Sequence, residues 1–340
     1  MIPAIFGLSG PHLTAEERAF FRDADPAGYI LFGRNCEGPA QLRALTDDLR
    51  SIHGRDRVLI SIDQEGGRVA RLRPPLWSSY PCGEVFDRLY QIAPASAIEA
   101  ARANATAMGL ELSAMGITVD YHPPLDLRVP GAHDVIGDRA FGSDPMQVAA
   151  LGRATLEGLA AGGVTGCVKH MPGHGRTDVD THKALPTVTA SADELKADLA
   201  PFRTLNHALI GMTGHLVFTV WDAENPATLS ETVIRDVIRG QIGFDGLLLT
   251  DDIDMEALGG TIPERAARAH GAGCDIILNC WAKMDDMTGI CAALPAMSAA
   301  TTARFDRALA GTRIAPVIAP EQAEMLARRD ALLALTGTPA

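Results

Sequence analysis

Short apolar runs alternate along the chain with longer stretches in which apolar and charged residues recur at helical spacing. There are eight such runs: IPAIFGL (2–8), GYILF (28–32), RVLISI (57–62), ITVDY (117–121), VTGCVK (164–169), LIGMTGH (209–215), GLLLT (246–250) and CDIILN (274–279). A buried strand followed by an amphipathic helix is the repeating unit of a parallel sheet. Eight such units favour an α/β fold of the (β/α)8, or TIM, barrel type over a doubly wound open sheet.

The connecting stretches carry the signals that begin helices. Thr14 stands before AEERAFFRDA with Glu17 three places on, and SADELKADLAPF repeats this relation, which is the pattern of a capping box. No linker rich in glycine, serine or proline divides the chain, so we expect residues 1–340 to form one barrel domain. The stretch of about 284–340 is rich in alanine, leucine and arginine, and we expect it to form helices packed outside the barrel.

Polar residues follow nearly every predicted strand at the point where the strand ends. They are Asp63, Asp126, Lys169, His170, His215, Asp251 and Asn279. In a parallel barrel, the carboxyl ends of the strands surround one mouth, and this face carries the chemistry. Any one of these residues is explained by capping of a strand end, but a set of them in register favours an active site.

Two further segments add charged groups near this face. SIDQEGGRVARLR brings Asp63, Arg68 and Arg71 around two glycines that permit a tight turn, and GDRAFGSDP adds Arg139 after the fourth strand. Carboxylates and guanidinium groups together suit the vicinal hydroxyls of a sugar, because each hydroxyl both donates and accepts hydrogen bonds. This combination favours a carbohydrate as the substrate.

The segment KHMPGHGRTDVDTH is the most polar part of the predicted mouth. It begins at Lys169 and places His170, His174 and His182 close to Asp180. Histidines in such a segment serve as metal ligands, as carriers of a proton, or simply as part of a polar surface loop. The segment alone leaves these three interpretations open.

Composition narrows the range of partners. The chain has 340 residues, 47% of them hydrophobic, and a formal net charge of −12, which disfavours nucleic acid and anionic membranes as partners. The six cysteines show no CxxC spacing, so neither a zinc cage nor a disulfide framework is indicated. The amino terminus does not resemble a secretory signal. No apolar segment approaches the roughly 20 residues that span a bilayer, and we therefore expect a cytoplasmic protein.

Taken together, the motifs KHMPGHGRTDVDTH, TDDIDMEAL, SIDQEGGRVARLR, GDRAFG and ILFGRN resemble those of glycoside hydrolase family 3, and specifically its single-domain β-N-acetylglucosaminidases. The resemblance extends from about residue 5 to about residue 280. It implies a barrel without a metal or other cofactor and a cytosolic location. It also implies removal of N-acetylglucosamine from muropeptides during recycling of the cell wall.

The resemblance further implies roles for individual residues. Asp251, the first acidic residue of TDDIDM, would be the nucleophile, and His182 with Asp180 would form the acid–base dyad. Contacts with the substrate are implied for Asp63, Arg71, Arg139, Lys169, His170 and His215. Met171 stands where the family usually has phenylalanine, and Thr181 stands where it usually has serine. Both differences are conservative.

These roles agree with the chemistry of a retaining glycosidase. Such an enzyme needs a carboxylate that attacks the anomeric carbon and an acid that protonates the leaving oxygen. A histidine is able to act as that acid near neutral pH when a partner fixes its tautomer, and Asp180 lies on the same face as His182 if the segment is extended. Asp251 and Asp252 point to opposite faces of a strand. Periodicity does not choose between them, whereas the resemblance favours Asp251.

Three alternatives remain at this stage. A metal-dependent hydrolase would use histidines and one aspartate as ligands: His170, His174, His182, His215, and Asp63 or Asp251. The positive charge of Lys169 opposes a divalent cation there. A glycoside phosphorylase would use phosphate in place of water, and a sugar-binding protein without activity would need neither a nucleophile nor a proton carrier. We expect a monomer that binds a small sugar substrate. The sequence does not identify the leaving group of that substrate.

Overall fold

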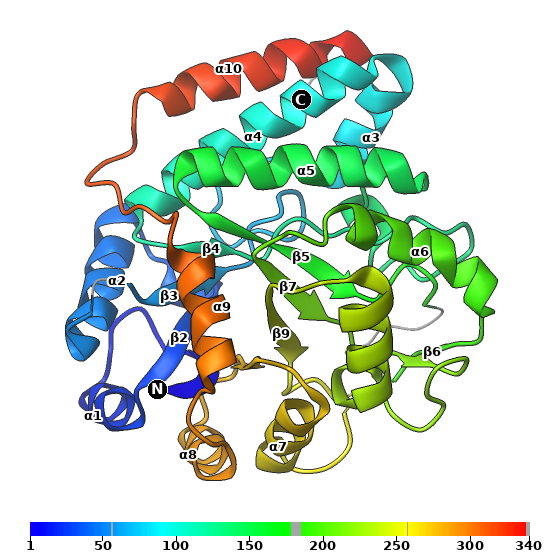
Figure 1. Cartoon of the computed structure of the whole chain (residues 1–340). Helices are drawn as coiled ribbons and strands as arrows, with labels where there is room; N and C mark the ends of the chain where they lie inside the picture. Colours follow the sequence, from blue (N-terminus) through cyan, green and yellow to red (C-terminus); the bar gives the residue numbers. More distant parts are fainter. Residues whose placement is uncertain (56, 178–184, 257, 338–340) are drawn as a thin grey trace.

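The computed structural model describes residues 1–55, 57–177, 185–256 and 258–337. At its centre is a closed barrel with the strand order β1-β10-β9-β7-β5-β4-β3-β2, in which every neighbouring pair is parallel (Figure 1). The strands are β1 (Ile2–Gly7), β2 (Pro26–Leu31), β3 (Leu59–Ile62), β4 (Val119–Asp120), β5 (Thr165–Met171), β7 (Ile210–Thr213), β9 (Leu247–Asp252) and β10 (Ile276–Asn279). Each predicted apolar run forms one of these strands, which confirms the barrel fold.

The strands are buried on both faces. Ile5 and Leu249 belong to the cluster that fills the barrel interior, and both are fully buried. Their neighbours Phe6 and Leu248 belong to the cluster between the strands and the outer helices, and both are also fully buried. Burial on two faces explains why the runs are continuously apolar rather than alternating with polar residues.

Helices surround the barrel (Figure 1). They include α1 (Ala15–Ala24), α2 (Pro39–His53), α3 (Gly83–Ile92), α4 (Pro94–Ala114), α5 (Pro145–Gly162), α6 (Ala192–Thr204), a π-type helix (Val233–Ile242), α7 (Ile262–Ala272), α8 (Met284–Ala293), α9 (Ala299–Leu309) and α10 (Glu321–Leu333). Single 3-10 turns occur at Gly33–Asn35, Gly137–Arg139, Ala227–Leu229 and Ala334–Thr336. Both predicted capping boxes are present, at Thr14 with Glu17 and at Ser191 with Glu194.

The helices after the last strand cover two different parts of the barrel. α10 lies along α4 on the outside of the molecule (Figure 1). Phe305, Ala308 and Leu309 of α9 join the buried cluster of the barrel interior. The hydroxyl of Thr165, at the start of β5, donates a hydrogen bond of 2.7 Å to the carbonyl of Ala308. α9 therefore closes the amino-terminal end of the barrel.

A pair of two-residue strands, β6 (Thr187–Val188) and β8 (Val217–Phe218), lies apart from the barrel and was not predicted. Two residues are too few to show an alternating pattern, so their sequence carried no signal of a strand. Within the described ranges, no helix combines the length and the apolar character needed to cross a membrane.

Candidate active site

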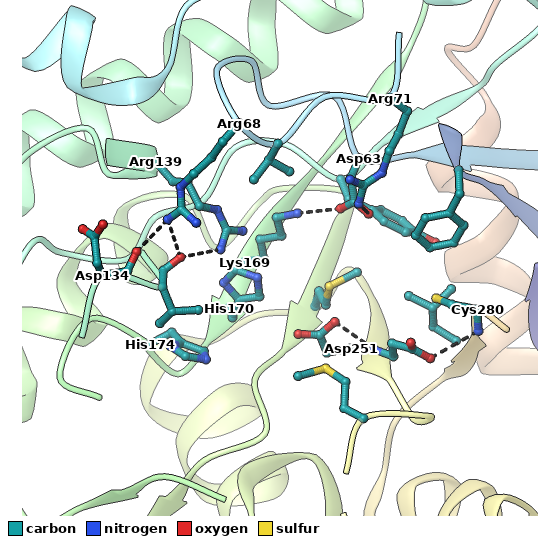
Figure 2. A pocket seen from close by; sticks show the side chains of 18 of the residues that line it. Asp63, Arg68, Arg71, Asp134, Arg139, Lys169, His170, His174, Asp251 and Cys280 are labelled. Carbon is teal, nitrogen blue, oxygen red and sulfur yellow. Dashed lines mark hydrogen bonds and ion pairs between the residues drawn. The ribbon is translucent and has the colours of Figure 1, made fainter. Parts of the chain in front are cut away.

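A pocket of about 550 Å³ opens at the carboxyl ends of the barrel strands (Figure 2). It is lined by six of the residues to which the resemblance assigns a role: Asp63, Arg71, Arg139, Lys169, His170 and Asp251. They come from the segments that end or follow β3, β4, β5 and β9. The barrel thus brings together at one mouth charged groups that are far apart in the sequence.

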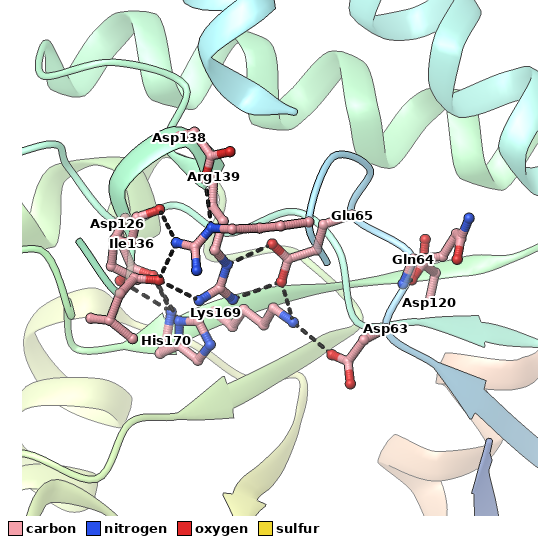
Figure 3. Close-up of polar contacts among 12 residues, drawn as sticks. Asp63, Gln64, Glu65, Asp120, Asp126, Ile136, Asp138, Arg139, Lys169 and His170 are labelled. Carbon is pink, nitrogen blue, oxygen red and sulfur yellow. Dashed lines mark hydrogen bonds and ion pairs between the residues drawn. The ribbon is translucent and has the colours of Figure 1, made fainter. Parts of the chain in front are cut away.

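Lys169 lies at the centre of an ion-pair network in this pocket (Figure 3). Its Nζ is 2.9 Å from Oδ1 of Asp63 and 2.7 Å from Oε1 of Glu65. Arg139 binds both oxygens of Glu65, at 2.8 and 2.7 Å. Arg71 donates to Oδ2 of Asp63 at 3.1 Å. The side chains of Lys169 and Glu65 are only 2% and 3% exposed, so the network is held in a largely dry environment.

The network keeps its members charged despite burial. Burial raises the pKa of Asp63, but Lys169 and Arg71 outweigh it and hold the pKa below the ordinary value. Burial has the same effect on Glu65, and Arg139 with Lys169 hold its pKa well below the usual range. The same carboxylates raise the pKa of Lys169 against the effect of burial. Fixed cations and carboxylates of this kind are suited to binding the hydroxyls of a sugar.

His170 is oriented by Asp126, a residue from the loop after β4. The ring Nδ1 lies 2.7 Å from Oδ2 of Asp126, and the backbone N–H of His170 points to the same carboxylate at 3.2 Å. Burial raises the pKa of Asp126, but His170 outweighs burial and lowers it. Because an ionised carboxylate only accepts hydrogen bonds, Nδ1 of His170 carries the proton that is shared with Asp126. The other ring nitrogen of His170, Nε2, is then available at the pocket wall.

His174 shares this anchor. Its backbone N–H donates to Oδ1 of Asp126 at 2.7 Å, and its ring lies edge-on to the ring of His170, with centroids 5.5 Å apart. Burial lowers the pKa of His174 to about 4, so its imidazole is neutral at physiological pH. In the part of the chain that the structure describes, its buried Nδ1 has no hydrogen-bond partner. His174 lines the pocket as a neutral ring.

Asp251 and Asp252, at the end of β9, have different surroundings although both line the pocket. Burial raises the pKa of Asp251, but the interactions with His215 and His170 outweigh burial and lower it. Burial and the charge of Asp254 instead raise the pKa of Asp252 to about 8. The Oδ1 of Asp252 also accepts backbone N–H groups from Asp254 at 3.1 Å and from Cys280 at 3.2 Å. Asp251 is thus the ionised carboxylate of the pair at neutral pH.

His215 lies behind the pocket wall and is not among the lining residues. Its side chain is buried, with Nδ1 2.8 Å from the hydroxyl of Thr228 and Nε2 2.9 Å from the backbone carbonyl of Asp252. Since the carbonyl only accepts, Nε2 donates to it. These bonds fix the end of β9, where Asp251 stands.

The predicted acid–base dyad, His182 and Asp180, lies outside the described residues. The described part of the same segment ends at Thr177, whose carbonyl accepts the backbone N–H of His133 at 2.7 Å. His133 lines the pocket. The described part of this segment therefore ends close to the pocket.

Glu65 was missed in the sequence, and Asp126 was placed at the active face without a role in binding or catalysis. Glu65 pairs with Lys169 and Arg139, and the period-two spacing from Asp63 was the signal that could have identified it. Asp126 was noted as a strand-end residue but was not assigned to the site, because its role depends on His170, which is remote in the sequence. Arg68, also noted, holds the loop over the pocket through Asp138 and the carbonyl of Asp134.

Among the residues that the structure describes, no group of three or more histidine, cysteine or acidic side chains is placed to hold a metal ion. Lys169 and Arg139 occupy the centre of the polar wall, where a divalent cation would be repelled.

Comparison with known proteins gives a consistent result. Residues 6–315 match the family described as "Glycosyl hydrolase family 3 N terminal domain". A β-hexosaminidase from Bordetella avium (strain 197N) is 39% identical over 287 residues, which is 82% of this chain and 80% of that protein. NagZ from Neisseria gonorrhoeae in complex with N-trifluoroacetyl-D-glucosamine has a TM-score of 0.88 at 32% identity, covering 98% of both chains. The same Neisseria protein in complex with zinc ion has a TM-score of 0.86 at 32% identity, covering 99% of this chain and 98% of that one.

Proposed function

The chain belongs to glycoside hydrolase family 3 and is a β-hexosaminidase, and from this premise we propose that it releases terminal, non-reducing β-linked N-acetylglucosamine with retention of configuration. The observation that carries the proposal is a half-buried carboxylate, Asp251, whose pKa is lowered and which lies at the wall of a pocket whose other side is built from paired cations and carboxylates. Such a pocket offers hydroxyl-binding groups and a nucleophile in one place.

The sugar ring lies against the ion-pair network in this proposal. Asp63 and Lys169 face the pocket from the ends of β3 and β5 and would bind neighbouring hydroxyls, while Arg71, Arg139 and His170 complete the wall. A hydroxyl that inserts between a carboxylate and an ammonium group finds both an acceptor and a donor. The related Neisseria protein binds an N-acylated glucosamine, which supports an amino sugar as the ring that is held.

The reaction then proceeds in two displacements. Oδ of Asp251 attacks the anomeric carbon, the bond to the leaving oxygen breaks, and a covalent glycosyl ester forms. His182, oriented by Asp180, gives its proton to the leaving oxygen. It then takes a proton from a water molecule that attacks the anomeric carbon and frees Asp251. The lowered pKa of Asp251 supports the first step, because only the ionised carboxylate is nucleophilic.

A bacterial muropeptide is the natural substrate that we propose, by analogy with the family, and the cytoplasmic location and monomeric state expected from the sequence remain predictions. The test of the activity is a panel of 4-nitrophenyl glycosides. We expect release of nitrophenol from the β-N-acetylglucosaminide, little from the β-glucoside, and none from either with Asp251→Asn. Equal turnover of the two glycosides, or full activity of Asp251→Asn, would overturn the proposal.

A glycoside phosphorylase uses the same arrangement and differs only in the group that attacks the glycosyl ester. Product analysis separates the two reactions. We expect free N-acetylglucosamine in buffer with or without inorganic phosphate, at the same rate. Formation of N-acetylglucosamine 1-phosphate, with a rate that rises with phosphate, would instead identify a phosphorylase.

A further inference from the structure

The loop that follows β3 folds back on itself before it reaches Arg71. Gly66 and Gly67 have φ angles of +95° and +55°, in the region that favours glycine, and they reverse the direction of the chain. Beside this turn, the carbonyl of Val69 accepts the backbone N–H of Glu65 at 2.8 Å, which joins the two legs of the loop. Between that point and Arg71, no backbone hydrogen bond joins the described residues of the two legs. Another contact must therefore fix the position of Arg71.

The side-chain amide of Gln64 provides that contact. Its Oε1 accepts the backbone N–H groups of Arg71 at 2.9 Å and of Leu72 at 3.1 Å, and its Nε2 donates to the carbonyl of Leu72 at 2.9 Å. The amide thus pairs with the second leg of the loop as a neighbouring strand would. Gln64 is 1% exposed and does not line the pocket, so it acts on the pocket only through the residues that it holds.

The backbone of Gln64 is itself fixed from the neighbouring strand. Its N–H donates to Oδ1 of Asp120, at the end of β4, over 2.9 Å. The carboxylates on either side of it, those of Asp63 and Glu65, pair with Lys169, and its own side chain points away from them (Figure 3). One residue therefore links the ion-pair network to the second leg of the loop.

We propose that Gln64 is a positioning residue whose amide sets the place at which the guanidinium of Arg71 enters the sugar pocket. The inference rests on the proposed function, in which Arg71 completes the wall that holds the sugar. The guanidinium donates to Oδ2 of Asp63 at 3.1 Å and lies over the ring of Phe32, 5.1 Å from its centroid. Neither contact fixes the backbone from which the side chain of Arg71 extends.

Loss of the amide would leave the N–H groups of Arg71 and Leu72 and the carbonyl of Leu72 without their partner. Unpaired polar groups in a buried place are costly, so the second leg would move to satisfy them. Such a movement displaces Arg71 from Asp63 and from the sugar. The effect of Gln64 on the reaction is therefore an effect on Arg71.

The first test is a double-mutant cycle with 4-nitrophenyl β-N-acetylglucosaminide as the substrate. Gln64→Met keeps the approximate size of the side chain and loses the amide, and we expect kcat/KM to fall about tenfold, the order expected when a contact of a charged group is lost. Arg71→Met should lose at least as much. Because Gln64 acts through Arg71, the double variant should be no slower than Arg71→Met alone. A double variant whose loss is the product of the two single losses would overturn the proposal, as would unchanged kcat/KM in Gln64→Met.

A second variant keeps the cycle informative if Gln64→Met does not fold. Gln64→Glu retains the oxygen that accepts the N–H groups of Arg71 and Leu72, so its loss in kcat/KM should be smaller than that of Gln64→Met. This smaller loss should also vanish when Arg71 is already replaced by methionine. A loss that persists in the Arg71→Met background would contradict positioning through Arg71.

Gln41→Met is the matched control. The amide of Gln41 also binds backbone groups, and none of the residues that provide them lines the sugar pocket: Pro11, Asn35 and Glu37. Gln41→Met should lower the melting temperature and leave kcat/KM unchanged. If it lowers kcat/KM as much as Gln64→Met does, the effect belongs to the stability of the barrel and the proposal is overturned.

The second test asks which part of the sugar responds. Three 4-nitrophenyl N-acetylglucosaminides that lack the 3-, 4- or 6-hydroxyl are compared in Gln64→Met, in Arg71→Met and in the unaltered protein. The analogue without the hydroxyl that Arg71 binds should be the least affected by Arg71→Met, and Gln64→Met should show the same order among the analogues. A different order in Gln64→Met would overturn the inference while the proposed function stands. Failure of the unaltered protein to turn over the parent N-acetylglucosaminide would instead defeat the proposed function itself.

Discussion

Asp252 donates its backbone N–H to Oδ1 of Asp251 over 2.8 Å. The two carboxyl groups are neighbours in the sequence but have different surroundings. The bond stabilises the ionised form of Asp251, in the same direction as His215 and His170. The carboxyl of Asp252 is instead paired with that of Asp254. At neutral pH, Asp251 is thereby favoured in its ionised form and Asp252 in its protonated form.

The first prediction concerns the identity of the nucleophile. A 5-fluoro N-acetylglucosamine analogue with a good leaving group should add its mass to a single peptide, and fragmentation should place the label on Asp251. Asp251→Asn should lose at least about a thousandfold in kcat, as expected when a nucleophile is removed. Asp252→Asn is the control and should still be labelled. Label on Asp252 alone would reverse the assignment.

The second prediction concerns pH and stability. The pKa of Asp252 is raised from 3.8 to about 8 in the folded protein. The folded state therefore keeps a proton that the unfolded state loses, and this residue's contribution to stability falls as the pH rises between these two values. The melting temperatures of Asp252→Asn and of the unaltered protein should be measured side by side at pH 5 and at pH 9. The difference between them should shift in favour of Asp252→Asn at the higher pH. A stability difference that does not change with pH would refute the raised pKa.

The third prediction concerns Lys169. Lys169→Met leaves Asp63 and Glu65 with one cation fewer in a buried site, which should cost about 3 kcal/mol in the free energy of unfolding. It should also lower kcat/KM, because the sugar loses a donor. Lys196→Met is the control, since Lys196 is 67% exposed and pairs with Asp193 on a surface helix. That change should cost under about 0.5 kcal/mol and leave the kinetics intact.

The fourth prediction addresses the dyad that lies outside the described residues. His182→Ala should lose far more rate on a disaccharide than on a dinitrophenyl N-acetylglucosaminide, because an activated phenolate departs without a proton. Asp180→Ala should show the same pattern more weakly. His174→Ala should leave the ratio of the two rates unchanged, since its ring is neutral and held at the wall. Equal losses on both substrates would mean that His182 positions the sugar rather than transferring a proton.

The fifth prediction separates this chemistry from metal catalysis. Dialysis against EDTA should leave turnover unchanged, because in the proposed reaction Asp251 and His182 provide the nucleophile and the proton without a Lewis acid. The control is the same preparation dialysed without EDTA. Loss of activity that zinc restores would support the metal-dependent alternative.

The barrel could be predicted because its signal is local. A strand buried on both faces needs a continuous apolar run, and all eight runs stand out in the sequence. Boundaries were less certain, since the run 117–121 yields only Val119–Asp120 as a strand. The positions of Asp63, Lys169 and Asp251 followed from the rule that polar residues at strand ends meet at one mouth.

The electrostatics of the site could not be predicted in the same way. Glu65 becomes important only through Lys169 and Arg139, and Asp126 only through His170, all of which are brought close by the closed barrel. The difference between Asp251 and Asp252 likewise depends on burial and on neighbours from other strands. Such relations belong to the folded chain rather than to any segment of it.

The position of α9 has a consequence for the order of events during turnover. Because Phe305, Ala308 and Leu309 are buried at the amino-terminal end of the barrel, the described pocket is reached from the carboxyl ends of the strands. In the proposed reaction, the sugar bound deepest in this pocket would enter before the group attached to it. The leaving group would therefore depart before the sugar, and the water that completes the cycle would arrive along the path that the leaving group has vacated.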